Sequence, residues 1–173
     1  MQIDTPRLLI RSLQLSDAPL LAAIWADPEV TLFMGGPRDR VEVQGGLEED
    51  ALLPDPPEID LWPVVEKSSG RVLGHCGLTE KEVDGQHEIE LVYVLERGSW
   101  GRGYATEAAS AIMRYAFGEL GLPRLISLID PRNAASERVA LKLGMTLERE
   151  TVRPGGKEMR VYAAAAPAEG GAS

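Results

Sequence analysis

The sequence predicts a mixed α/β fold: a largely antiparallel sheet of six or seven strands, flanked by helices, with one strand–helix–strand crossover. Two observations carry this prediction. Short apolar segments separated by turn-forming residues recur along the chain, which is typical of antiparallel strands. One long helical pattern, residues 105–120, lies between two such segments, so the strands on either side of it are expected to be parallel. The 173 residues are expected to form a single domain over residues 1–165 and a flexible tail over 166–173.

The N-terminal part of the chain predicts a strand, a helix and an irregular segment. The strand is Arg7–Arg11. Asp17, or the serine before it, is expected to cap a helix that ends at Asp27–Pro28, since a proline disfavours helical backbone in the residue before it. Residues 29–57 have poor periodicity and several glycines and prolines, although Asp39–Leu53 within them fits a short, acid-rich helix.

Three strands are expected in the middle of the chain, in a meander that leads into the long helix. They are Leu61–Glu66, Val72–Thr79 and His87–Leu95. Turns at Ser68–Gly70 and Asp84–Gly85 join them, and Asp-Gly is a strong hairpin signal.

The long helix has one apolar stripe at helical spacing. Gly121 is expected to end it, and Pro123 prevents its resumption. Its stripe predicts burial of one face against the sheet and consists of Ala105, Ala108, Ala109, Ile112, Met113, Ala116, Phe117 and Leu120.

The C-terminal third predicts one more strand, a shorter helix and a hairpin. Arg124–Ile129 is the strand that should lie parallel to its predecessor. Asn133 is expected to cap a helix that runs to Leu143. The hairpin consists of Met145–Glu150 and Lys157–Ala164.

Composition excludes several classes of function. The net charge of −9 argues against a nucleic-acid partner and weakly favours a cationic one. No apolar run is long enough to cross a membrane, and no signal peptide is seen. A lone cysteine, Cys76, fits a reducing cytoplasm, and with only two histidines in the chain a metal site has little support.

The glycine-rich turn Arg97–Thr106 precedes the long helix and is the strongest candidate for a binding site. The N-terminus of a helix offers unpaired backbone N–H groups and a positive dipole end, and glycines allow an anion to approach closely. Thr106 stands where a dinucleotide fingerprint requires glycine, and the Gly-Lys-Ser/Thr of a P-loop is missing. A tight turn without a ligand is the alternative interpretation.

The segment Trp100–Ala108 resembles the acyl-CoA pyrophosphate loop of the GNAT superfamily of N-acetyltransferases, whose pattern is Gln/Arg-x-x-Gly-x-Gly/Ala. Gly103 and Ala105 match it, while Trp100 replaces Gln/Arg, which is similar to the RimJ/RimL-like branch that acetylates the N-termini of ribosomal proteins. The resemblance extends from Thr5 to about Tyr162. It implies acetyl-CoA as co-substrate, no metal, and direct transfer of acetyl to a primary amine, either a peptide N-terminus or a small molecule.

The resemblance implies a set of residues that bind the cofactor. Backbone N–H groups from Arg102 to Thr106, including those of Gly103, Tyr104 and Ala105, are expected to hold the pyrophosphate, with the Thr106 hydroxyl as a further donor. Arg97 and Arg102 are candidates to balance its charge, although either fits an ordinary surface charge equally well.

A second matching segment, Asn133–Met145, resembles the family's Asn-x-x-Ser…Lys-x-Gly-Phe pattern along the pantetheine arm. Asn133 would hydrogen-bond that arm, Ser136 would contact the cofactor or protonate the leaving thiolate, and Lys142 would meet the nucleotide phosphates. Asn133 also fits a plain helix cap. Ala140 stands where many members place a tyrosine as general acid, so a non-catalytic acyl-CoA-binding module is an alternative, as is a different acyl donor.

The strand before the loop carries the expected catalytic groups. In the resembling family a backbone N–H on this strand polarises the acetyl carbonyl, and here it belongs to Tyr93 or Val94. Glu88 and Glu90 face one side of the sheet, and strand pattern alone favours a solvated face for both.

The match of Glu90–Tyr93 to the family's Glu-Ile-Gly-Tyr favours Glu90 as the general base, acting through water. His87 and His75 are weaker candidates for that role. Residues 29–57 and the terminal hairpin are expected to select the acceptor, and a homodimer is left open.

Overall fold

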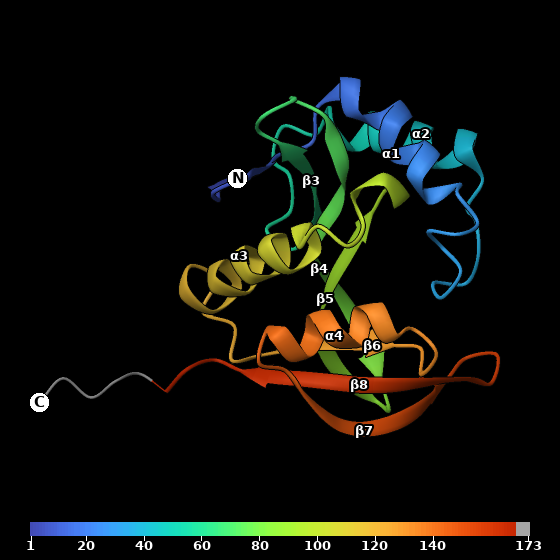
Figure 1. Ribbon diagram of the computed structural model, residues 1–173, viewed down its shortest axis with the longest axis vertical. Coiled ribbons are helices and arrows are strands. Elements are labelled where there is room, and N and C mark those ends of the chain that lie inside the picture. Colours follow the sequence, from blue (N-terminus) through green and yellow to red (C-terminus); the bar gives the residue numbers. More distant parts are fainter. Residues whose placement is uncertain (169–173) are drawn as a thin grey trace, which may run out of the picture.

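The computed structural model describes residues 1–168. Eight strands form one sheet in the order β1-β2-β3-β4-β5-β6-β8-β7. Neighbouring strands are antiparallel except β5 and β6, which flank helix α3 and run parallel (Figure 1). The strands are β1 Gln2–Asp4, β2 Leu8–Arg11, β3 Leu61–Glu66, β4 Val72–Val83, β5 Gln86–Leu95, β6 Arg124–Ile129, β7 Thr146–Arg153 and β8 Lys157–Ala165. The helices are α1 Ala18–Trp25, α2 Arg40–Asp50, α3 Tyr104–Gly118 and α4 Ala134–Lys142, with short 3-10 turns at Leu15–Asp17 and Arg97–Ser99.

The mixed, largely antiparallel fold with one crossover is confirmed, whereas the expected number of strands was too small. The additional strand is β1, which pairs with β2 through three residues from Gln2 to Asp4. A three-residue strand with one apolar side chain, Ile3, leaves no periodicity to detect. The part of the expected tail from residue 166 to 168 is irregular, and residues 169–173 lie outside the described part of the chain.

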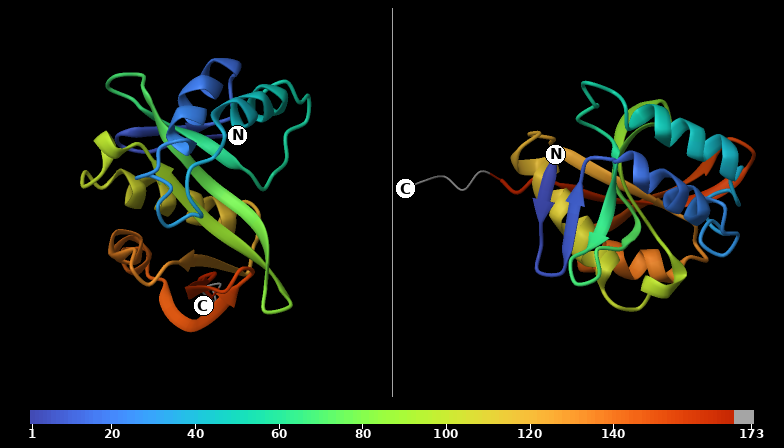
Figure 2. Two further views of the ribbon diagram at one scale, coloured as in Figure 1. Left: turned by 90° about the vertical axis from the view of Figure 1, so that its right-hand side faces the viewer. Right: turned by 90° about the horizontal axis from the view of Figure 1, so that it is seen from above.

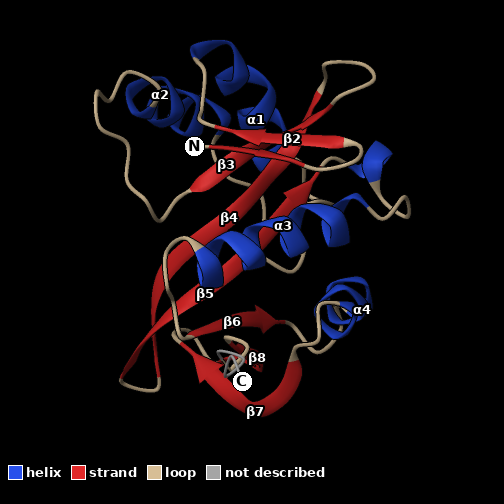
Figure 3. Ribbon diagram, turned by 90° about the vertical axis from the view of Figure 1, so that its left-hand side faces the viewer, coloured by secondary structure: helices blue, strands red, loops and turns tan. Residues whose placement is uncertain are grey.

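Helix α3 covers one face of the sheet and forms the main core with it (Figure 3). The predicted stripe is buried, with Ala108, Ala109, Ile112 and Ala116 inaccessible to solvent. Gly121, at φ 62°, follows the helix in the left-handed conformation that commonly ends helices. The apolar pattern therefore predicted this helix correctly, although the helix ends at Gly118, two residues before Leu120, the last residue of the pattern.

Helices α1 and α2 pack on the opposite face of the sheet, where Leu21 and Val65 share a small cluster with Leu47 (Figure 2). Asp39 caps α2 by accepting a hydrogen bond from the Glu42 N–H at 2.9 Å, so the acid-rich helix within the irregular segment is real. Asp17 does occupy the N-cap position of α1, but its carboxylate makes no capping bond to that helix. It is bound by the guanidinium of Arg11 instead, at 2.6 and 2.9 Å.

Candidate active site

A cleft of about 670 Å³ opens where α3 begins, β5 ends and α4 passes β6. The loop after α1 closes one side of it through residues 29–34. Ten of the twelve residues predicted for the site line this cleft: Glu90, Tyr93, Val94, Gly103, Tyr104, Ala105, Thr106, Asn133, Ser136 and Lys142. Arg97 and Arg102 are not among the lining residues.

The start of α3 has the geometry of an anion site. Gly103 is the N-cap residue, at φ 78°, and no side chain caps the helix. Gly101 also has a positive φ, 71°, which an L-residue with a side chain rarely adopts. Within residues 1–168, the first-turn N–H groups of Tyr104, Ala105 and Thr106 therefore have neither a helical nor a side-chain partner, and the three residues line the cleft.

The two loop arginines are engaged elsewhere. Arg97 is bound to Asp27 and Glu29, each at 3.0 Å, and so ties the loop to the segment that follows α1. Arg102 lies over the ring of Tyr104, 4.9 Å from its centroid, and within 3.7 Å of Glu66. In the described part of the chain, both arginine side chains therefore bind other protein side chains and hold the loop in place.

Arg7 is the residue that sequence reasoning missed, and it supports the loop from behind. Its Nε donates to Glu107 Oε2 at 2.7 Å, its backbone N–H donates to Glu107 Oε1 at 2.9 Å, and its Nη1 donates to the Arg102 carbonyl at 2.8 Å. Its guanidinium also stacks on Tyr104, 4.4 Å from the ring centroid. Thr5 completes the clamp by donating to Glu107 Oε1 at 2.6 Å. The available signal was the Thr-Pro-Arg-Leu segment at the start of the family resemblance.

Strands β5 and β6 separate within the cleft. They pair at Glu90 and Ile126, but beyond this point side chains take the backbone groups that would extend the ladder. Ser127 Oγ donates to the Leu91 carbonyl at 2.9 Å, and the Leu128 N–H donates to Glu90 Oε1 at 3.3 Å. Because backbone direction alternates along a strand, the Tyr93 N–H faces β6, as the Leu91 carbonyl does.

The same alternation settles which backbone donor faces the gap. Val94 lies opposite His75 in the β4–β5 ladder and directs its N–H toward β4. Of the two candidates that the sequence left open, Tyr93 is thus the one with an N–H directed into the space between β5 and β6.

Glu90 and Glu88 share a face of β5, as predicted, but the expectation of a solvated face was wrong. Each side chain is only 12% exposed. Glu88 is neutralised by Arg124 at 3.0 Å. Glu90 has weaker partners, namely the Thr79 hydroxyl at 3.4 Å and Lys81 Nζ at 3.9 Å. Burial raises the pKa of the Glu90 carboxyl, and the charge of Lys81 only partly opposes this.

The two histidines lie away from the cleft. His87 is exposed and 3.8 Å from Glu80, on the far part of β5. His75 is buried on β4, where its Nδ1 accepts a hydrogen bond from Trp25 Nε1 at 3.0 Å. Neither histidine lines the active-site cleft.

Helix α4 brings two polar side chains to the cleft. Asn133 is its cap, accepting from the Ser136 N–H at 3.1 Å, while its Nδ2 donates to Ser136 Oγ at 3.0 Å. Since Ser136 Oγ accepts this bond, its own proton remains available. The Tyr93 hydroxyl donates to the Ser136 carbonyl at 3.0 Å, and burial raises the pKa of that phenol. Ala140 is fully buried in the main core, away from the cleft.

Two further properties bear on the class of protein. Within residues 1–168, no three His, Cys, Asp or Glu side chains are grouped closely enough to hold a metal ion. No helix in this part of the chain is long and apolar enough to span a bilayer.

Comparison with known proteins identifies the family to which this fold belongs. Residues 7–146 match the family described as "Acetyltransferase (GNAT) domain". Protein YkkB of Bacillus subtilis is 33% identical over 162 residues, which cover 93% of this chain and 94% of YkkB. The crystal structure of a GNAT-family acetyltransferase from Bacillus anthracis has a TM-score of 0.81 and 26% identity, with 95% of this chain and 98% of that chain covered.

A ribosomal-protein-S5-alanine acetyltransferase from Vibrio fischeri has the same fold, with a TM-score of 0.77 and 18% identity over 96% of this chain and 97% of that chain. The chain belongs to the GNAT family of acetyltransferases. Members of this family use acetyl-CoA as co-substrate.

Proposed function

We propose that the protein transfers an acetyl group from acetyl-CoA directly to a primary amine. The observation that carries the proposal is the presence, in one cleft, of an uncapped helix start, a gap between parallel strands and a buried carboxylate. The first is suited to a diphosphate, the second to an extended thioester arm, and the third to accepting a proton from an ammonium group.

The cofactor would lie with its pyrophosphate against the N–H groups of residues 103–106 and its pantetheine arm between β5 and β6. Asn133 and Ser136 border that path on α4, and Lys142 lies further along the same helix, in reach of nucleotide phosphates. The thioester oxygen would accept a hydrogen bond from the Tyr93 N–H, which supports the negative charge that develops there during attack.

The acceptor amine must lose a proton before it attacks. Glu90 is suited to remove that proton through water, because its raised pKa makes the carboxylate a better base than an exposed glutamate. The amine nitrogen then bonds to the carbonyl carbon and becomes positively charged. It loses its extra proton to water as the carbon–sulfur bond breaks, and the thiolate takes a proton from water or from Ser136 Oγ, which water reprotonates. The products are an N-acetylated amine and CoA with a free thiol.

A peptide N-terminus is the acceptor class that the RimJ/RimL-like loop favours. Trp100 at the first motif position supports it, as does the likeness in fold to an acetyltransferase named for a ribosomal protein. An α-amine near pKa ~8 is also far easier to deprotonate at neutral pH than a lysine near ~10.4.

The test is a transferase screen with acetyl-CoA and N-terminal peptides, polyamines, amino sugars and amino acids. Release of the CoA thiol and a mass increase of the product by one acetyl group are expected for at least one acceptor. A melting shift with acetyl-CoA and no turnover across all acceptors would contradict the proposal and favour a binding module. A different mass increase with another acyl-CoA would identify another donor.

A further inference from the structure

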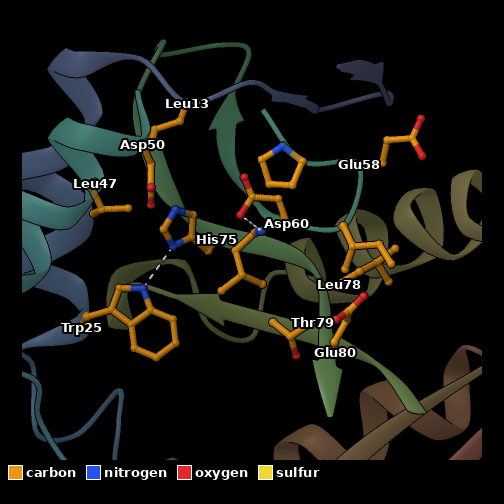
Figure 4. Close-up of a pocket in the computed structure, with 13 residues that line it drawn as sticks. Leu13, Trp25, Leu47, Asp50, Glu58, Asp60, His75, Leu78, Thr79 and Glu80 are labelled. Carbon is orange, nitrogen blue, oxygen red and sulfur yellow. Dashed lines mark hydrogen bonds between the residues drawn. The ribbon is translucent and has the colours of Figure 1, made fainter. Parts of the chain in front are cut away.

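A second cleft, of about 770 Å³, lies on the α1–α2 face of the sheet and is distinct from the candidate active site (Figure 4). Helices α1 and α2 and the segment before β3 form its walls, and β4 forms its floor. Its lining contains four carboxylates and no lysine or arginine: Leu13, Trp25, Leu47, Asp50, Pro57, Glu58, Ile59, Asp60, Leu61, His75, Leu78, Thr79 and Glu80. We call it the acidic cleft.

The carboxylates of the acidic cleft are largely without cationic partners. Within residues 1–168, Asp50, Glu58 and Asp60 form no ion pair, and the partner of Glu80 is the exposed His87 at 3.8 Å. Asp60 accepts one hydrogen bond, from the Leu61 N–H at 2.7 Å. Burial raises the pKa of the Asp60 carboxyl, and the neighbouring charge of Asp50 adds to the effect. A bound cation would relieve this repulsion.

An unsatisfied buried donor also lines the acidic cleft. His75 is only 3% exposed, and burial lowers its pKa to about 4, so the imidazole is neutral. Because Nδ1 accepts from Trp25, the proton of the neutral ring is on Nε2, which has no partner in the described part of the chain. Figure 4 shows this free edge of the ring turned away from Trp25, on the side of Asp50. A buried N–H of this kind calls for an acceptor oxygen.

The acidic cleft adjoins the candidate active site along the β4–β5 ladder, and a side-chain contact joins the two. Thr79 lies opposite Glu90 in the β4–β5 register, and its hydroxyl is 3.4 Å from Glu90 Oε2. Thr79 lines the acidic cleft, and Glu90 lines the active-site cleft. A molecule that reaches across Thr79 therefore places one end near the proposed base and the other end among the carboxylates.

We propose that the acidic cleft binds a second basic group of the acceptor, which makes the preferred acceptor a molecule with at least two cationic groups. One amine is acetylated beside Glu90. The other, an ammonium or guanidinium, is held by Asp50 and Asp60 next to the indole of Trp25, and a carbonyl or hydroxyl oxygen of the acceptor accepts from His75 Nε2. A short peptide with a free N-terminus and a nearby lysine or arginine has this chemistry. The inference rests on the proposed function.

Matched acceptors test the role of the charge. Glycine-initiated peptide amides with lysine at position 2, 3 or 4 are compared with the same peptides containing norleucine, which lacks only the ammonium group. For the peptide with the best spacing, we expect kcat/KM to be about tenfold higher with lysine than with norleucine, mainly because KM is lower. A tenfold ratio corresponds to the contribution of one charge-assisted hydrogen bond. Asp60→Asn and Asp50→Asn should each reduce this ratio. Glu119→Gln, an exposed carboxylate at the end of α3 that lines neither cleft, should leave it unchanged.

A binding measurement separates this inference from the transferase activity. N-acetylated versions of the peptides have no free α-amine, and without acetyl-CoA no amine can be acetylated, so calorimetric titration under these conditions reports occupancy alone. Tighter binding of the lysine form, weakened by Asp60→Asn, is expected even if no acceptor is turned over. Equal turnover and equal binding of the lysine and norleucine peptides would overturn the inference while leaving the transferase intact. Two small amines test the oxygen contact, because neither 1,5-diaminopentane nor pentylamine contains an oxygen. If the ratio of their kcat/KM values equals the lysine-to-norleucine ratio of the peptides, binding of the cation by the carboxylates is supported and the oxygen contact to His75 is refuted.

Discussion

Replacement of Glu90 with glutamine tests the proposed chemistry most directly. The amide keeps the shape of the side chain, and its one oxygen can still accept from the Leu128 N–H. Its NH2 group then takes the place of the oxygen that accepts from the Thr79 hydroxyl and can donate to that hydroxyl instead, but the amide cannot take a proton. Loss of a general base typically costs about 10²- to 10⁴-fold in rate. We therefore expect kcat to fall by about that factor, with little change in the affinity for acetyl-CoA, since the diphosphate site is at the other end of the cleft.

The same substitution should not weaken the fold. The pKa of Glu90 is higher in the folded than in the unfolded chain, so its contribution to stability is fully present at low pH and is lost as pH rises through the folded pKa. Glutamine removes this penalty. At neutral pH the variant should melt at the same temperature as the wild type or higher, while at pH values below the unfolded pKa near 4.5 the gain should vanish.

Glu88→Gln is the matched control because Glu88 lies on the same strand and face, with the same 12% exposure. It should keep its turnover and lose stability, by roughly 1–2 kcal/mol, since it leaves Arg124 with Glu148 as its remaining partner. The assay is CoA release at saturating acceptor and acetyl-CoA, together with thermal melts at several pH values. Less than about a tenfold loss of kcat in Glu90→Gln, or an equal loss in Glu88→Gln, would refute the reasoning.

Three further results are expected. Arg7→Gln should raise KM for acetyl-CoA by roughly tenfold, with a smaller effect on kcat, because it removes the charged donors that hold the Arg102 carbonyl and Glu107. An unchanged KM would show that Arg7 does not hold the loop in its binding conformation. Gly103→Ala should lower stability by about 1 kcal/mol and weaken acetyl-CoA binding in calorimetry, because its φ of 78° is strained for alanine and the new Cβ would lie 3.4 Å from Arg7 Nη2. Acetyl-CoA at about 100 times its dissociation constant should stabilise the fold by roughly 2.7 kcal/mol in a thermal melt, and a shift with a dinucleotide instead would point to another cofactor.

Local pattern was sufficient for most of the fold. The stripe of α3 and the turn at Asp84–Gly85 are set by residues close in sequence, and both are present as predicted. The three residues of β1 carry no such pattern, and their pairing with β2 depends on a contact between segments. Strand pattern alone favoured a solvated Glu90, and it failed for a related reason: polarity along β5 cannot reveal that Thr79 and Lys81 of β4, Leu128 of β6 and the loop after α1 surround that side chain.

The sequence pattern could not predict the ion pairs that the site residues make with side chains distant in sequence. Arg97 and Arg102 lie beside the glycines of the loop, which suggested phosphate ligands, but Asp27, Glu29 and Glu66 bind them from segments at least 36 residues away. Arg7 reaches Glu107 across 100 residues. A motif identifies the backbone conformation of a loop, whereas the charges that hold the loop in place follow from the tertiary fold.

The arrangement of the two faces of the sheet favours direct transfer over an acyl-enzyme intermediate. The cysteine of the chain, Cys76, has no solvent exposure, and burial raises the pKa of its thiol, so it is neither accessible nor ionised as a nucleophile must be. The uncapped start of α3 and Glu90 line the same cleft, within which β5 and β6 separate. A thioester anchored at α3 and an amine approaching from the α1–α2 face therefore converge at this gap. If this is correct, incubation with acetyl-CoA alone should leave the mass of the protein unchanged, and a stable increase by one acetyl group at a cleft residue would refute direct transfer.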